Sequence, residues 1–147
     1  MRVLMLAPAF PSEMPFFARG LASVVTWGPG ERGLAETAVA ASRGAARCSP
    51  ATTLREFVAL ARRARLVVAA DTGPLHIACA VGTPAVGLYG PTAPERNGPF
   101  SPHDRVVRSV PRCAPCYSRN CAVHAGIMDR LAVPDVVAAV ERRLEGA

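Results

Sequence analysis

The residues best suited to chemistry lie in the segment at residues 71–76. It follows an apolar run at residues 66–70, which predicts a strand buried on both faces, as in parallel sheets. Such a strand would deliver Asp71 to the ligand crevice at its carboxyl end. Thr72 and Gly73 would then begin a helix whose free amides and dipole attract an anion, and Gly73 lets a phosphate approach the backbone. The segment therefore predicts a phosphate site beside a carboxylate.

Two roles remain open for each ionisable side chain of this segment. A carboxylate repels a phosphate, so Asp71 suits sugar hydroxyls; alternatively, Asp71 or Thr72 only caps the helix. His76 lies one turn into the helix, where it could reach back toward a bound phosphate or be an ordinary core histidine.

A glycine-rich turn at residues 28–33 (GPGERG) matches the G-x-G-x-x-G pattern of dinucleotide-binding folds. The acid expected about 20 residues further on is absent, because residues 48–51 read CSPA. Pro29 would also stiffen a loop that has to wrap a pyrophosphate. Two other interpretations stay open: a strand-to-helix turn that needs glycine, or a site in which Glu31 faces the crevice and holds hydroxyls.

Arg96 lies in a loop rich in Pro and Gly, residues 90–102, that follows a second apolar run at residues 85–89. The loop would therefore reach the same edge of the sheet. It is not a P-loop, because no Gly-Lys-Ser/Thr follows. Arg96 could bind a phosphate through two N–H groups, or it could be an ordinary solvated arginine.

Three of the five cysteines form a cluster with a histidine, in the spacing C-x₂-C-x₄-C-x₂-H: Cys113, Cys116, Cys121 and His124. This spacing could hold zinc, or the thiols could be structural and unmetallated. The count is odd and no export signal precedes it, which argues against a disulfide framework. The sequence predicts no other cofactor.

The pattern of elements predicts an α/β fold with a Rossmann-like, doubly wound parallel sheet, because strands and helices alternate. A capping box at Thr53 and Glu56 begins one of the helices. Prolines break up residues 1–20, which we leave as an unplaced N-terminal segment before a single domain at residues 21–147. Without a first strand the sheet would have an open edge that invites association. The expected strands are 22–27, 45–48, 66–70, 85–89 and 105–110, and the expected helices are 31–42, 53–64, 74–81 and one from residue 134.

The composition narrows the class of protein. The chain has 147 residues, about one domain, and half of them are hydrophobic, which excludes a disordered tail, a collagen-like repeat and a coiled coil. The net charge of +6 favours anionic partners such as phosphates and nucleotides. Scattered arginines and an aromatic content of 5% argue against nucleic acid. The first apolar run is too short for a signal peptide, and none approaches a membrane span, so we expect a cytoplasmic protein.

Four stretches carry a resemblance to a known family: residues 71–78 (DTGPLHIA), 82–84 (GTP), 88–94 (LYGPTAP) and 98–99 (GP). They resemble the signature of glycosyltransferase family 9, the heptosyltransferases of the lipopolysaccharide inner core. The resemblance implies the C-terminal, donor-binding half of a GT-B enzyme. That half binds an ADP-heptose-type donor, and an N-terminal half binds the lipopolysaccharide acceptor at the inner membrane.

The resemblance also implies roles for single residues. Asp71 matches the aspartate that contacts the donor sugar, and Thr72 with Gly73 matches the phosphate-binding pair. His76 matches the histidine of the motif, and Glu31 matches the acid that binds the ribose. The cysteine segment is similar to one in heptosyltransferase II-like members, although a further cysteine of that segment is lost here.

The departures from the family lie at the N-terminus. A full member is roughly twice as long, and the catalytic base belongs to the half that the resemblance does not cover, so we expect no catalytic residue in this chain. The expected reaction is inverting: a base deprotonates the acceptor hydroxyl, which displaces ADP. Three hypotheses follow: a donor half that needs a separate acceptor half, a gene remnant or wrongly assigned start, and a non-catalytic module that binds a nucleotide sugar or zinc.

Overall fold

The computed structural model describes residues 2–6, 22–116 and 126–146. Their strands form one six-stranded sheet in the order β3-β2-β1-β4-β5-β6, and every neighbouring pair is parallel. This is the strand order of the doubly wound Rossmann fold, in which the order reverses between the first and fourth strands. The predicted fold class is therefore confirmed. The strands are β1 (Arg2–Leu6), β2 (Ala22–Thr26), β3 (Ala46–Cys48), β4 (Leu66–Ala70), β5 (Ala85–Tyr89) and β6 (Arg105–Arg108).

The strand β1 lies in the middle of the sheet, where the sequence predicted none. It pairs with β2 from Arg2 opposite Ala22 onward, and with β4 from Val3 opposite Leu66. The prediction that residues 1–20 stay outside the domain is thus wrong for residues 2–6, and so is the prediction of a sheet without its first strand. The prolines that argued against regular structure follow β1 and lie outside the described residues.

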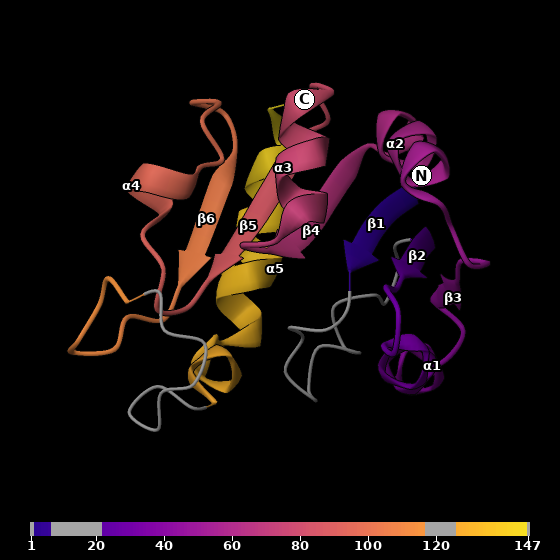
Figure 1. Ribbon diagram of the computed structural model, residues 1–147, viewed down its shortest axis with the longest axis horizontal. Coiled ribbons are helices and arrows are strands. Elements are labelled where there is room, and N and C mark those ends of the chain that lie inside the picture. Colours follow the sequence, from indigo (N-terminus) through magenta and orange to yellow (C-terminus); the bar gives the residue numbers. More distant parts are fainter. Residues whose placement is uncertain (1, 7–21, 117–125, 147) are drawn as a thin grey trace.

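The helices cover both faces of the sheet (Figure 1). Alternate residues of β4 point to opposite faces, so that Leu66 and Val68 join one core cluster while Val67 and Ala69 join the other. The first cluster includes residues of α1 and α5, and the second includes residues of α2 and α3. The helices are α1 (Arg32–Ala41), α2 (Leu54–Arg63), α3 (Gly73–Ala80), α4 (Pro94–Asn97) and α5 (Val133–Glu145), with a short 3-10 helix at Ile127–Arg130.

A buried ion pair ties the C-terminal helix to the sheet. Arg143 of α5 donates from Nε to Asp104 Oδ1 at 2.9 Å, and the two side chains are only 10% and 3% exposed. The same carboxylate oxygen accepts the amide of Ala85, the first residue of β5, at 2.9 Å. Asp104 thus fixes α5 and the start of β5 to one point.

We expect the loss of Arg143 to destabilise the fold strongly. Arg143→Met leaves the Asp104 carboxylate buried without its cation, which costs about 3–5 kcal/mol of unfolding free energy. Urea titration measures the loss. Arg108→Met is the matched control, because Arg108 and Glu95 form a pair that is 45% and 71% exposed and worth less than about 1 kcal/mol. Equal losses in the two variants would contradict the role given to Asp104.

Candidate functional site

The carboxyl ends of β2 and β4 border a cleft of about 400 Å³. Its lining comes from the last residue of β2 and the turn that follows it (residues 26–31), from residues 52–57 at the start of α2, and from residues 72–77 at the start of α3. The chain leaves β2 toward α1 on one face of the sheet and leaves β4 toward α3 on the other. The cleft therefore lies beside the reversal of strand order, where open α/β sheets bind ligands.

Glu31 lies in the cleft, as one of the two interpretations of the glycine-rich turn predicts. It precedes α1, and its Oε2 accepts the Gly28 amide at 2.9 Å. A Cβ on Gly28 would lie 3.0 Å from that oxygen, so glycine lets the carboxylate approach the backbone. Gly30 has a φ of +81°, so the turn itself also needs glycine. Both interpretations thus describe part of the geometry.

At the start of α3 the backbone borders the cleft without a side-chain cap. Thr72 occupies the N-cap position, as one interpretation predicts, but neither its side chain nor that of Asp71 makes a capping hydrogen bond. The Thr72 hydroxyl donates instead to the Ala70 carbonyl at 3.2 Å. A Cβ built on Gly73 meets no atom within 4 Å. An anion could therefore approach this helix start closely.

Asp71 is held from two sides. Its Oδ1 lies 3.2 Å from His76 Nε2, and its Oδ2 accepts the side-chain amide of Asn97 at 2.7 Å. The Asp71 side chain is only 10% exposed, whereas that of His76 is 48% exposed. His76 is therefore not a core histidine. Asp71 and His76 lie beside the cleft, on the side of α4, and do not line it.

Sequence reasoning singled out Arg96 and missed its neighbour. Arg96 is exposed and lies outside the residues that line the cleft, while Asn97 reaches Asp71. Only the position of Asn97 in the sequence could have indicated a role for it: it belongs to the segment that follows β5, which reaches the same edge of the sheet.

The opposite wall of the cleft depends on the start of α2. The predicted capping box is confirmed: Glu56 Oε2 accepts the Thr53 amide at 2.7 Å, and the Thr53 hydroxyl accepts the Glu56 amide at 3.3 Å. The bonds from the Thr53 backbone and then from its hydroxyl lower the pKa of Glu56. Nearby, the Trp27 indole donates to the Ser49 carbonyl at 3.2 Å, and Arg32 lies over its ring.

Three buried hydroxyls have no partner among the residues that the structure describes: Thr26, which lines the cleft, Ser49, and Tyr89 at the end of β5. Burial raises the pKa of Tyr89, and the charge of Asp71 raises it further. The phenol is therefore neutral and adds no charge to this edge of the sheet.

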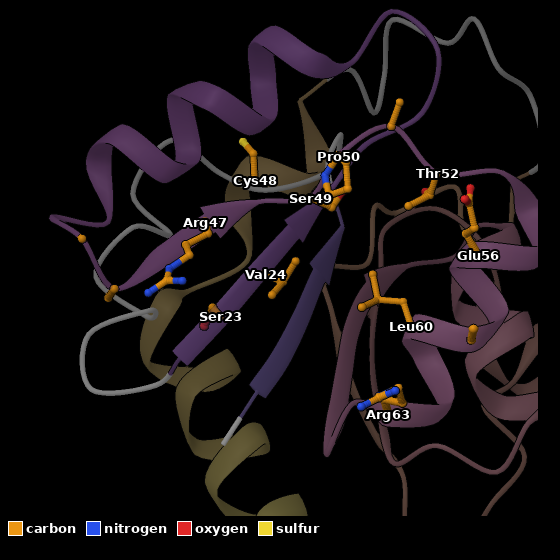
Figure 2. A pocket seen from close by; sticks show the side chains of 14 residues that line it. Ser23, Val24, Arg47, Cys48, Ser49, Pro50, Thr52, Glu56, Leu60 and Arg63 are labelled. Carbon is orange, nitrogen blue, oxygen red and sulfur yellow. The ribbon is translucent and has the colours of Figure 1, made fainter.

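A larger groove, of about 700 Å³, lies between β3 and α2 and shares Thr52 with the cleft. Figure 2 shows Arg47 on the β3 side, Leu60 and Arg63 on the α2 side, and Val24 between the two sides. None of the sequence-predicted donor residues lines this groove. The smaller cleft is therefore the candidate site.

The cysteine cluster is described only in part. Cys113 is exposed and Cys116 is half-buried, both with free thiols, and the Cys116 amide donates to the Pro91 carbonyl at 2.8 Å. Cys121 and His124 lie outside the described residues, so zinc ligation and unmetallated structural thiols both stay open as interpretations of the cluster. Among the helices that the structure describes, none has the length and apolar character to cross a membrane.

Comparison with known proteins gives consistent matches. The family described as Glycosyltransferase family 9 (heptosyltransferase) matches residues 17–125. Lipopolysaccharide heptosyltransferase 1 of Pseudomonas aeruginosa is 30% identical over 112 residues, which are 76% of this chain and 32% of that protein. The solved structure of the Escherichia coli ADP-heptose lps heptosyltransferase II superposes with a TM-score of 0.77 at 20% identity, over 99% of this chain and 47% of that one. An E. coli heptosyltransferase, WaaC, superposes with a TM-score of 0.70 at 21% identity, over 97% and 43%. The chain spans less than half the length of these relatives.

The capping box predicts a pH-dependent contribution to stability. Thr53→Ala should lower the unfolding free energy by about 1 kcal/mol at neutral pH. A carboxyl whose pKa is lowered by folding stabilises the fold above its unfolded pKa, and this contribution is lost as the pH falls through the folded pKa. The gap between Thr53→Ala and the parent chain, measured by urea titration, should therefore narrow in acid. Thr52→Ala is the control and should show no such change; a gap that stays constant with pH would contradict this account.

Proposed function

The chain belongs to glycosyltransferase family 9, and from that premise we propose that it is the donor-binding half of an inverting heptosyltransferase. The donor is an ADP-heptose-type sugar nucleotide, and the acceptor is the inner core of lipopolysaccharide. The observation that carries the proposal is the single cleft that brings Glu31 together with the bare helix start at Gly73. One nucleotide could therefore place its hydroxyls at the Glu31 carboxylate and its phosphates at the backbone amides that begin α3.

The order of the strands sets the direction of the donor. Glu31 follows β2, Gly73 follows β4 and Asn97 follows β5, and these strands occur in that order across the sheet. In our proposal the ribose hydroxyls bind Glu31, the diphosphate lies at the start of α3, and the sugar extends toward Asp71 and α4. This arrangement separates the Asp71 charge from the phosphates, which a carboxylate repels.

The remaining donor residues complete the phosphate end. We assign Thr72 to the phosphates together with Gly73. We assign His76, which lies beside Asp71, to the side of the site where it could reach back toward a bound phosphate. Arg96 belongs to α4, and we assign to it the supply of positive charge near the donor. The proposal of adenine as the nucleobase is supported by structures of a similar protein: E. coli WaaC has been solved with ADP and with ADP-2-deoxy-2-fluoro heptose.

The reaction itself needs an acceptor half. In the proposed mechanism a base on that half takes the proton of the acceptor hydroxyl, the hydroxyl oxygen attacks the anomeric carbon, and ADP leaves with the bonding electrons. This chain's part is to bind the donor, orient the anomeric carbon and stabilise the negative charge on the leaving ADP. The acceptor half would also bring the complex to the inner membrane, where the chain acts as a cytoplasmic, peripheral protein.

Gly73→Ala tests the phosphate site directly. The added methyl meets no protein atom within 4 Å, so the fold should be unchanged. The methyl would occupy the space that a phosphate needs, and ADP affinity should fall about tenfold or more, as measured by calorimetry. Gly33→Ala is the matched control, since its Cβ also meets nothing within 4 Å and it lies on α1, away from the phosphates. Unchanged ADP affinity in Gly73→Ala would contradict the proposal.

Asp71→Ala tests the sugar site. ADP-heptose should lose affinity by about tenfold or more, because its sugar hydroxyls lose a charged acceptor. ADP alone should bind nearly as before. Trp27, the one tryptophan of the chain, lines the cleft and provides a fluorescence signal for both titrations. Equal losses for the two ligands would show that Asp71 does not bind the sugar.

A further inference from the structure

The Asp71 carboxylate has a contact that its proposed role in sugar binding does not explain. Oδ2 accepts a short 2.7 Å hydrogen bond from the side-chain amide of Asn97, a residue of α4 that is 26 positions away in the sequence. Oδ1 lies 3.2 Å from His76, on the helix that Asp71 itself precedes. Both oxygens of a nearly buried carboxylate are thus engaged from different elements, which restricts rotation of the side chain.

The donor on α4 is itself held in place. The Asn97 amide donates to the Ala93 carbonyl at 3.0 Å, and the Gly98 amide donates to the Pro94 carbonyl at 2.8 Å. These bonds close the single turn of α4, and Asn97 is half-buried. The backbone that carries Asn97 is therefore fixed where its side-chain amide donates to Asp71. The pair between Glu95 and Arg108 on the same helix is exposed and does not involve Asn97.

The chemical type of this donor matters. An ionised carboxylate has about four lone-pair sites, so a single amide leaves others free. Unlike an arginine or lysine, an amide leaves the carboxylate charge unneutralised, and hydroxyls bind most strongly to a charged acceptor. A neutral donor thus fixes the orientation of the carboxylate and preserves its affinity for hydroxyls.

We propose that Asn97 is a positioning residue for the donor sugar: it orients the Asp71 carboxylate so that its free lone pairs face the sugar hydroxyls. This inference rests on the proposed function, because it concerns the sugar end of the same site. Asn97 acts through Asp71 and does not contact the nucleotide. It should therefore affect the sugar-dependent part of binding and leave binding of ADP unchanged.

The experiment compares the affinities of ADP-heptose and ADP for each variant, with Trp27 fluorescence as the signal. Asn97→Ala should lower the affinity for ADP-heptose relative to that for ADP by about tenfold, with the affinity for ADP unchanged. Asn97→Leu keeps a side chain of similar size, removes the donor and adds no charge beside Asp71, so it should lower the ratio about as far. Glu95→Ala is the matched control on α4 and should leave both affinities unchanged. If Asn97→Ala does not fold, Asn97→Leu carries the test.

A double-mutant cycle separates positioning from direct contact. In the Asp71→Ala background, Asn97→Ala should cause no further loss of the sugar-dependent affinity, because the group that it orients is gone. An equal loss in both backgrounds would overturn the inference. It would also be overturned if Asp71→Ala removed the sugar-dependent affinity while both Asn97 variants kept it. Failure of the parent chain to bind either ligand would instead reject the proposed function.

Discussion

The reversal of strand order between β1 and β4 is the constraint on which the candidate site depends. Parallel strands must be joined by crossovers, and on either side of a reversal these crossovers lie on opposite faces of the sheet. The segment after β2 therefore leads to α1 on one face, and the segment after β4 leads to α3 on the other. Because the two segments diverge, the carboxyl edge stays open between them, and Glu31 and Gly73 border the opening from opposite sides.

Much of the fold could be predicted because its signals are local. The apolar runs at β4 and β5 and the capping box of α2 each occupy a few consecutive residues, and the structure places these elements where the sequence indicates them. The strand β1 could not be predicted in this way. Its five residues are held by pairing with β2 and with β4, which lies about sixty positions away in the sequence. The prolines that follow β1 are residues that usually interrupt regular structure, so they argued against a strand nearby.

The position of the candidate site could likewise be predicted where it depends on local sequence, and could not be predicted where it depends on contacts between distant residues. Residues directly after a strand must lie at the carboxyl edge, so Asp71, Thr72 and Gly73 could be placed there from the sequence. The bond between Asn97 and Asp71 depends on which way a one-turn helix faces. Consecutive residues of a helix point about 100° apart, so charge favoured Arg96 while geometry brings Asn97 to the carboxylate.

The placement of Asp71 also resolves a conflict that the sequence poses. A carboxylate one residue from an anion-binding helix start would weaken that site if its charge faced the phosphate. In the structure Asp71 is turned toward α4 by Asn97 and flanked by His76, and it does not line the cleft that Gly73 borders. The same segment can thus present bare backbone to an anion on one side and a carboxylate to hydroxyls on the other. A sugar nucleotide is a ligand with this division of charge: its phosphates are anionic, and the sugar beyond them is neutral and rich in hydroxyls.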